Sequence, residues 1–444
     1  MKLRTGFTLL KWLVLLSSLF LFAACGSSGG GGGDDDSNIP VTKNDYTLLA
    51  WNDLGMHCLN PTYDTLVILP PYNTVWAQLV KRGNPPELAT TDVTLTYAMV
   101  NNSSSVDKTS SLFGGDYGQF WDYAMDLFGF TPADDVGLTG NGLSGTMVSV
   151  GTHFEIDGIP VTPVDDDGVW NPYQIVEITA KDSSGNTIAT TRATVPTSDE
   201  INCGKCHDGN TVAETFADIL EKHDDEHGTD LVNSTPVLCA DCHGSPVLGT
   251  SGPGTSGLYL SEAIHGLHAD EGASCYDCHP GNVTQCSRSK AHTATDGNCI
   301  TCHGDMDNVA DTISDDGRIP WVNEPKCSTC HSGIAEVDTG IVLYRNAVGH
   351  GGVNCAGCHG SPHAMYPSEE ETDNYQPIQY QGKNLTLGSC AVCHSKARGK
   401  EDDPDEFLDE HGGSKNPSAC AVCHTKFDSA DENRWPHHYE WTNH

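Results

Sequence analysis

The chain has 444 residues and a formal net charge of −37 at pH 7, because 60 Asp and Glu residues face only 23 Lys and Arg residues. Such an acidic surface repels polyanions, so nucleic acid is not expected as a partner, whereas cationic partners or positively charged mineral surfaces are compatible with it. Cysteine and histidine are crowded into the C-terminal part, which divides the chain near residue 198 into two regions that are each of domain length.

The N-terminal segment has the pattern of a secretory signal. Lys2, Arg4 and Lys11 accompany an apolar run over residues 12–24 that is too short for a standard membrane span. The Leu-Phe-Ala-Ala sequence before Cys25 is similar to a bacterial lipoprotein cleavage site, in which Cys25 becomes the lipidated first residue. Ordinary signal cleavage is the alternative. We therefore expect a lipoprotein signal peptide over residues 1–24 and a flexible Gly/Ser/Asp-rich tether over residues 25–40.

Residues 41–198 alternate β-rich stretches with Pro and Gly, which predicts an all-β domain. The expected strands cover residues 46–51, 65–69, 75–80, 93–100, 174–180 and 187–195, and a short helix is expected over residues 120–130. The last two strands flank a Ser/Gly/Asn turn, which favours a hairpin. We expect a β-sandwich of general immunoglobulin shape. No catalytic constellation is recognisable in it, which favours a scaffold or docking role.

Eight Cys-x-x-Cys-His motifs fill residues 199–444. The pattern is typical of covalent c-type haem attachment, because two cysteines three positions apart can each bond one vinyl group of the same haem. The His that follows then lies under the iron as its proximal ligand. Zinc ribbons are the alternative, but they have no use for a His after every cysteine pair.

The motifs predict eight covalent haem c groups. The attaching cysteines are Cys203, Cys206, Cys239, Cys242, Cys275, Cys278, Cys299, Cys302, Cys327, Cys330, Cys355, Cys358, Cys390, Cys393, Cys420 and Cys423. The proximal iron ligands are His207, His243, His279, His303, His331, His359, His394 and His424.

Residues 199–444 have few long apolar runs and only roughly 30 residues for each motif, too few to bury a normal side-chain core. We expect the haems to supply the apolar interior of a multihaem cytochrome c domain, with short helices over residues 212–221, over residues 261–268 and at the motifs. Little other regular structure is expected, and the irregular motif spacing does not predict a solenoid.

Histidines outside the motifs are numerous enough to give each iron a second axial ligand. The expected distal ligands are His227, His265, His268, His292, His350, His363, His411 and His438, with His223 and His437 as alternatives to the close neighbours His227 and His438. The region has only two methionines, Met306 and Met365, so bis-His ligation and low potentials should dominate. Iron without an open position favours electron transfer over substrate binding.

With these motifs the chain resembles the multihaem c-type cytochromes that metal-reducing, electroactive bacteria place on their surface. The resemblance also rests on the lipoprotein-like start and on blocks such as Cys278-His279-Pro280-Gly281, and it covers residues 199–444. It implies a wire of stacked haems anchored at the outer membrane through lipidated Cys25. Its expected partners are other redox proteins and extracellular electron acceptors, and broad metal reduction is compatible with it.

Two other functions stay open. Octahaem oxidoreductases acting on small nitrogen or sulfur oxyanions also carry eight haems, but their active haem often has a Cys-x-x-Cys-Lys motif or a vacant distal side, and all eight motifs here end in His. The second alternative is a subunit of a polymerised cytochrome filament, in which homo-oligomer contacts bring haems together.

Three smaller features complete the sequence. The acidic runs at residues 165–167 and 401–406 are candidate Ca²⁺ sites, although neither has the EF-hand spacing. Cys58 and Cys286 belong to no motif, and they either pair across the boundary between the two regions or stay as isolated thiols. His57, beside Cys58, is a further candidate iron ligand.

Overall fold

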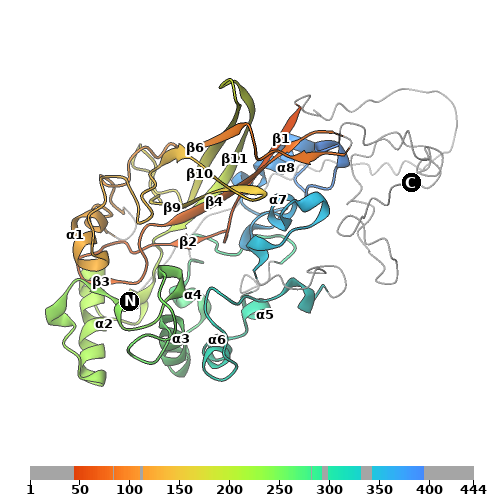
Figure 1. Ribbon diagram of the computed structural model, residues 1–444. Helices are drawn as coiled ribbons and strands as arrows, with labels where there is room; N and C mark the ends of the chain where they lie inside the picture. Colours follow the sequence, from red (N-terminus) through yellow and green to blue (C-terminus); the bar gives the residue numbers. More distant parts are fainter. Residues whose placement is uncertain are drawn as a thin grey trace, which may run out of the picture. The chain divides into compact units, whose positions relative to one another are not determined.

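Two five-stranded β-sheets packed face to face make up the first region of the computed structural model (Figure 1). The structure describes residues 45–394 apart from residues 84, 111–113, 282, 293–298 and 332–342. The first sheet has the order β1 (Tyr46–Asn52), β4 (Asn73–Lys81), β9 (His153–Ile159), β8 (Val148–Val150), with β5 (Glu87–Leu88) also paired to β4. The second has the order β2 (His57–Cys58), β11 (Thr187–Ser198), β10 (Tyr173–Asp182), β6 (Val93–Val100), β7 (Ser144–Thr146).

The core of this sandwich lies between the sheets. Leu79 and Ile156 from the first sheet pack against Tyr97, Val176 and Ile178 from the second. In β10 every second residue is buried, as expected for a strand with one face on the core. The expected β-sandwich and the hairpin of β10 and β11, in which Glu177 lies opposite Arg192, are therefore confirmed.

Strands β7, β8 and β9 are among those that the sequence did not predict. All residues of β7 and β8 are exposed, so no apolar alternation marks these two strands. Strand β9 was missed although Phe154 and Ile156 are buried in alternation with their neighbours. The strand expected over residues 65–69 is reduced to β3 (Leu66–Val67), which pairs in parallel with β12 (Val237–Leu238). The expected helix is present as α1 (Gln119–Phe128), which ends at Gly129 in the left-handed conformation that glycine favours.

The second region consists of short helices and single turns, as expected. The helices are α2 (Val212–His227), α3 (Leu260–Asp270), α4 (Cys275–Cys278), α5 (Cys299–His303), α6 (Met306–Ser314), α7 (Cys355–His359) and α8 (Tyr375–Gln381). The 3₁₀ turns are η1 (Cys203–Lys205), η2 (Val232–Ser234), η3 (Cys239–Asp241), η4 (Pro246–Leu248), η5 (Cys327–Thr329), η6 (Tyr344–Asn346), η7 (His350–Gly352), η8 (Pro362–Ala364), η9 (Glu371–Asn374) and η10 (Cys390–Val392). In the described part of the chain, no helix has the length and apolar character needed to cross a membrane.

Strand β1 of the first sheet is buried on both of its faces. Alternate residues of β1 point to opposite sides, so Leu48 faces the sandwich core while Leu49 and Trp51 pack against Tyr344 and Tyr380 of the second region. This arrangement explains why residues 47–52 of β1 are all buried, in contrast to the alternating β10. The two regions therefore share an apolar interface.

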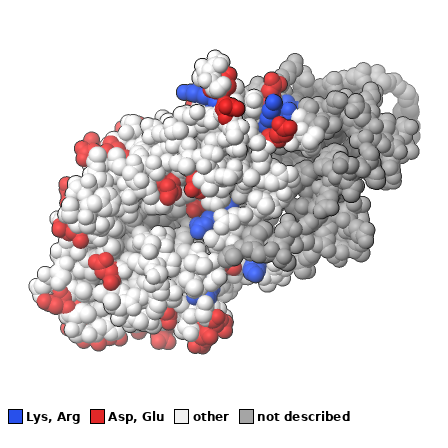
Figure 2. All heavy atoms as spheres, viewed as in Figure 1, with Lys and Arg blue, Asp and Glu red and all other residues white. Residues whose placement is uncertain are grey.

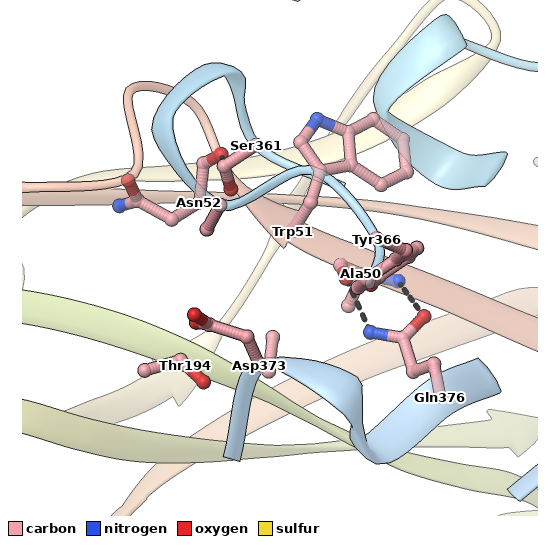
Figure 3. A pocket seen from close by; sticks show the side chains of 10 residues that line it. Ala50, Trp51, Asn52, Thr194, Ser361, Tyr366, Asp373 and Gln376 are labelled. Carbon is pink, nitrogen blue, oxygen red and sulfur yellow. Dashed lines mark hydrogen bonds between the residues drawn. The ribbon is translucent and has the colours of Figure 1, made fainter. Parts of the chain in front are cut away.

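Side chains of the second region also cover the free edge of β1. Gln376 of α8 accepts a hydrogen bond from the Ala50 amide at 3.0 Å and donates one to the Ala50 carbonyl (Figure 3). One turn later, the Tyr380 hydroxyl accepts from the Leu48 amide at 3.1 Å and donates to the Leu48 carbonyl at 2.6 Å. An edge strand exposes a row of unpaired backbone groups, and α8 satisfies them here with side chains.

Candidate haem-ligand site

The described motifs adopt one turn of helix, which brings their three reactive side chains to the same side. We number the motifs 1 to 8 in chain order, from the one that begins at Cys203 to the one that begins at Cys420. In motif 1 the His207 amide donates to the Cys203 carbonyl at 3.0 Å, and in motif 3 the His279 amide donates to the Cys275 carbonyl at 2.9 Å. Positions i, i+3 and i+4 of such a turn share one face, as attachment of one haem requires.

Part of the expected ligand set lies outside the described residues. This applies to motif 8, with Cys420, Cys423 and His424, and to the expected distal ligands His411 and His438. The side chains of Cys390 in motif 7 and of the expected distal ligand His350 are also outside the described part, although their backbones are placed in η10 and η7.

Five motif histidines each face a second histidine across a similar gap. The ring centres are 6.2 Å apart for His207 and His268, 6.4 Å for His243 and His223, 6.0 Å for His279 and His265, 6.3 Å for His303 and His363, and 6.1 Å for His331 and His292. Two imidazoles that share one metal atom through bonds of about 2 Å have ring centres roughly 6 Å apart. The five pairs therefore have the separation that bis-His ligation of one iron requires.

The hydrogen bonds of seven of these ten rings leave the same nitrogen available. The Nδ1 atoms of the seven histidines lie 2.6 to 3.3 Å from a protein oxygen. These oxygens belong to Asp218 for His207, Thr229 for His223, Ser256 for His243, Ser261 for His265, Ile264 for His268, Ser289 for His292 and Leu54 for His363. A partner on one ring nitrogen orients the ring and directs the other nitrogen, Nε2, to the metal.

The two histidines of the β region have the opposite arrangement. His57 uses Nε2 to contact the Asp53 carboxylate at 2.9 Å, and the Nε2 of His153 lies 3.5 Å from Glu155 while its ring stacks on Trp76. Their Nε2 atoms point to carboxylates in place of a motif. The structure therefore does not present His57 as the further iron ligand that the sequence left open.

Helix α2 carries two neighbouring histidines, of which His223 is the one that faces motif 2. The rings of His223 and His227 lie 4.8 Å apart on successive turns, and the ring of His223 faces that of His243. Helix α3 places two histidines toward two different motifs, since His268 faces motif 1 and His265 faces motif 3. A single helix thus spans the space between two motifs.

Burial keeps several of these rings neutral. Desolvation lowers the pKa of His279 and of His363 to about 4, so both imidazoles are uncharged at pH 7. The neutral imidazole is the form that binds a metal ion. Together with the ring separations and the free Nε2 atoms, this environment fits the haem group that the motifs predict.

Contacts between motifs arrange seven of them in one continuous file. Motifs 1 and 2 meet where Cys203 and Cys239 pack against the same apolar cluster, and motifs 1 and 3 meet at the ion pair of Lys205 with Asp277. Motifs 3 and 4 are linked because α3, whose His265 faces motif 3, packs on α6, which follows motif 4.

The file continues through the later motifs. Desolvation raises the pKa of Cys302 in motif 4, and the nearby Cys330 of motif 5 is the second cause of this rise. Motifs 5, 6 and 7 share one apolar cluster through Cys327, Cys355 and Cys393. The contacts therefore link motifs 2, 1, 3, 4 and 5 in that order, and the shared cluster joins motifs 6 and 7 to motif 5.

A small pocket lies at the seam between β1 and the second region (Figure 3). Ala50, Asn52, Ser361, Asp373 and Gln376 are among the residues that line it. Much of its polar lining is already engaged, because Gln376 bonds Ala50, Ser361 bonds the Asn52 carbonyl and Asp373 pairs with the buried Arg288 at 2.9 Å. The pocket is a part of the interface between the regions and has no catalytic constellation.

The acidic run at residues 165–167 has protein partners. The Asp165 carboxylate accepts from Gln174 at 2.8 Å, and Asp166 pairs with Lys108 at 3.1 Å. Within the described ranges, no group of three or more His, Cys, Asp or Glu side chains is placed to hold a metal ion. The other candidate Ca²⁺ site, at residues 401–406, lies outside them.

The face seen in Figure 2 carries many more Asp and Glu side chains than Lys and Arg side chains.

Comparison with known families places one part of the second region. Residues 267–342, which contain motifs 3, 4 and 5, match the family model of cytochrome c3. The searches of curated proteins and of solved structures found no match to the chain. The family match supports a multihaem cytochrome c that binds haem c covalently and takes part in electron transfer.

Proposed function

We propose that this multihaem cytochrome c is an electron relay at the outer membrane or cell surface, where it passes electrons to extracellular acceptors. The observation that carries the proposal is the set of five histidine pairs with ring centres 6.0 to 6.4 Å apart. Bound haem would supply a one-electron iron centre at each pair. Two histidines per centre leave no position for a substrate, which favours transfer over catalysis.

We assign the axial pairs from the ring contacts. The distal ligands of motifs 1, 3, 4 and 5 are His268, His265, His363 and His292. All four are among the distal ligands that the sequence predicts. For motif 2 the contact favours His223 over His227. The continuous file of motifs supports a path that enters or leaves at motif 2, and the lipoprotein-like residues before Cys25 support a position on the outer membrane.

The relay is tested by comparing electron acceptors with the purified, reduced holoprotein. Ferric chelates and quinone analogues should all oxidise it, at rates that follow driving force. Anionic acceptors should react faster as salt rises, because screening weakens their repulsion by the acidic surface. Saturable turnover of nitrite, hydroxylamine or tetrathionate, far above that of a simple bis-His cytochrome, would replace the relay by an oxidoreductase.

The ligand assignment is tested by His292→Met with His153→Met as the matched control. Met raises the potential of a haem relative to His, so His292→Met should raise one potential and slow the relay while covalent attachment remains. His153 belongs to none of the five pairs, so its replacement should leave all potentials in place. Equal redox titrations of the two variants would contradict the assignment.

The anchor is tested separately, since Cys25→Ser should release a fully haem-loaded protein from membranes.

A further inference from the structure

In the described part of the chain, two cysteines belong to no motif. They lie on segments that hydrogen bonds hold together. Strand β2 pairs in parallel with the end of β11, so that Cys58 lies opposite Ser198. The Ser198 hydroxyl is 3.3 Å from the Thr284 hydroxyl, two residues before Cys286. Just beyond Ser198, the Glu200 carboxylate accepts hydrogen bonds from the amides of Val283 and Thr284 at 3.1 and 2.8 Å.

A buried arginine fastens the same segments from the other side. The Arg288 side chain is 1% exposed, and its Nη1 donates to the Gly55 carbonyl at 2.9 Å and to the Cys286 carbonyl at 3.1 Å. One guanidinium nitrogen therefore holds the backbone three residues before Cys58 and the backbone of Cys286 together. Hydrogen bonds of Thr284 and Glu200 hold the two segments together on one side of the cysteines, and those of Arg288 hold them together on the other side.

Both cysteines are partly buried, and Cys286 lies near enough to Cys58 to affect its pKa. Desolvation raises the pKa of Cys58 well above its ordinary value, and the nearby Cys286 is the second cause. Burial raises the pKa of Cys286 to about 11. Because the thiolate is the reactive form, two such thiols exchange slowly once the chain has folded, and a bond between them would be equally protected.

We infer that Cys58 and Cys286 form a disulfide that joins the β-sandwich to the haem-motif region. The Sγ–Sγ bond forms when both S–H bonds are lost, and the two protons and two electrons pass to an incoming protein or small-molecule disulfide, which leaves as two thiols. This inference does not depend on the proposed relay. The bond would lie next to motif 4, since the Arg288 amide donates to the carbonyl of its distal His363 at 2.7 Å.

Peptide mapping of the unreduced holoprotein tests the bond directly. The protein is denatured with iodoacetamide present and digested, and the peptides are identified by mass. A Cys58–Cys286 linked peptide without alkylation of either residue supports the bond. Alkylation of both residues in the unreduced protein, or a linkage of either one to Cys25, overturns it. This measurement uses the wild-type chain, so it is decisive even if the variants fold poorly.

Reduction and substitution measure what the bond does. After treatment with a thiol reductant, iodoacetamide should label neither cysteine in the native protein and both cysteines in denaturant. Cys58→Ser, Cys286→Ser and the double variant should lower the Tm by a similar amount, about 5–10 °C, because all three lose the same cross-link. Thermal shifts that add up in the double variant would show independent thiols and overturn the disulfide.

Discussion

The two regions of this molecule bury their interiors in different ways. The sandwich core is made of side chains alone, such as Val176 and Ile178, which are fully buried between the sheets. In the motif region, α4 and α5 have no buried residue, although both carry haem-attaching cysteines. Helices of this length are not stable by themselves in water. The comparison teaches that the first region is specified by its apolar pattern and the second by a covalent partner that the motifs recruit.

The strongest way to break this comparison is to produce the chain without haem attachment. The motif region should then lose its fold because its apolar interior is missing, while the sandwich keeps its own core. Hydrogen exchange followed by mass spectrometry should show α3 exchanging like an unfolded chain and the β10–β11 hairpin still protected. Native protection of α3 in the haem-free chain would show that side chains suffice there.

A core substitution in each region sharpens the contrast. Ile178→Ala removes a side chain with no exposed area and should lower the free energy of unfolding by about 2–5 kcal/mol. The control, Ile313→Ala in α6, removes an equally apolar side chain that is 5% exposed but belongs to none of the apolar clusters of the described residues. It should cost less than about 2 kcal/mol. Denaturant unfolding of the two holoproteins measures both, and equal losses would contradict the comparison.

The coupling between the regions is tested at Gln376. Gln376→Ala removes the side chain that bonds the Ala50 backbone and the Arg192 carbonyl, and the buried Ala50 groups lose their partners. The expected loss of stability is about 1–3 kcal/mol. Gln379→Ala is the matched control, because Gln379 lies on the same helix but bonds the exposed Thr190 and the hydroxyl of Thr191, so its loss leaves the Ala50 groups paired. Thermal unfolding should show a clearly larger shift for Gln376→Ala.

The smallest effect is expected at Asp218, whose carboxylate contacts the Nδ1 of His207 at 3.1 Å. A carboxylate on the second nitrogen makes a ligating imidazole more basic, so Asp218→Asn should raise one potential slightly and leave the haem content unchanged. The control is Glu214→Gln on the same helix, which bonds the Asn210 amide and makes no contact with His207. Redox potentiometry should separate the two variants.

Sequence patterns predicted the parts of this structure that have a local signal. Val93–Val100 was expected as a strand with the bounds that the structure gives, because its pattern repeats every second residue. The turn at each motif of the described residues also follows from its spacing. The fully buried β1 was expected as a strand, but the sequence could not show that its second face packs on α8, more than three hundred residues later in the chain.

The pairing of the axial ligands could be predicted only in part. The histidines themselves stand out by number, and four of the expected distal ligands face a motif histidine. Their partners depend on long-range packing, since His363 faces His303 of motif 4 although motif 6 is nearer in sequence. On α2, His223 and His227 are one turn apart, and only the position of the helix selects between them. The orienting groups Asp218, Thr229 and Ser256 had no recognisable signal.

The covered edge of β1 sets a problem of timing for the growing chain. Tyr46–Asn52 is made early, whereas the side chains that cap it, Gln376 and Tyr380, are made near the end. Until they arrive, the strand can pair with the same strand of a second nascent molecule, which is a common route to aggregation. Chains truncated before residue 375 lack both capping side chains and should therefore accumulate as insoluble material.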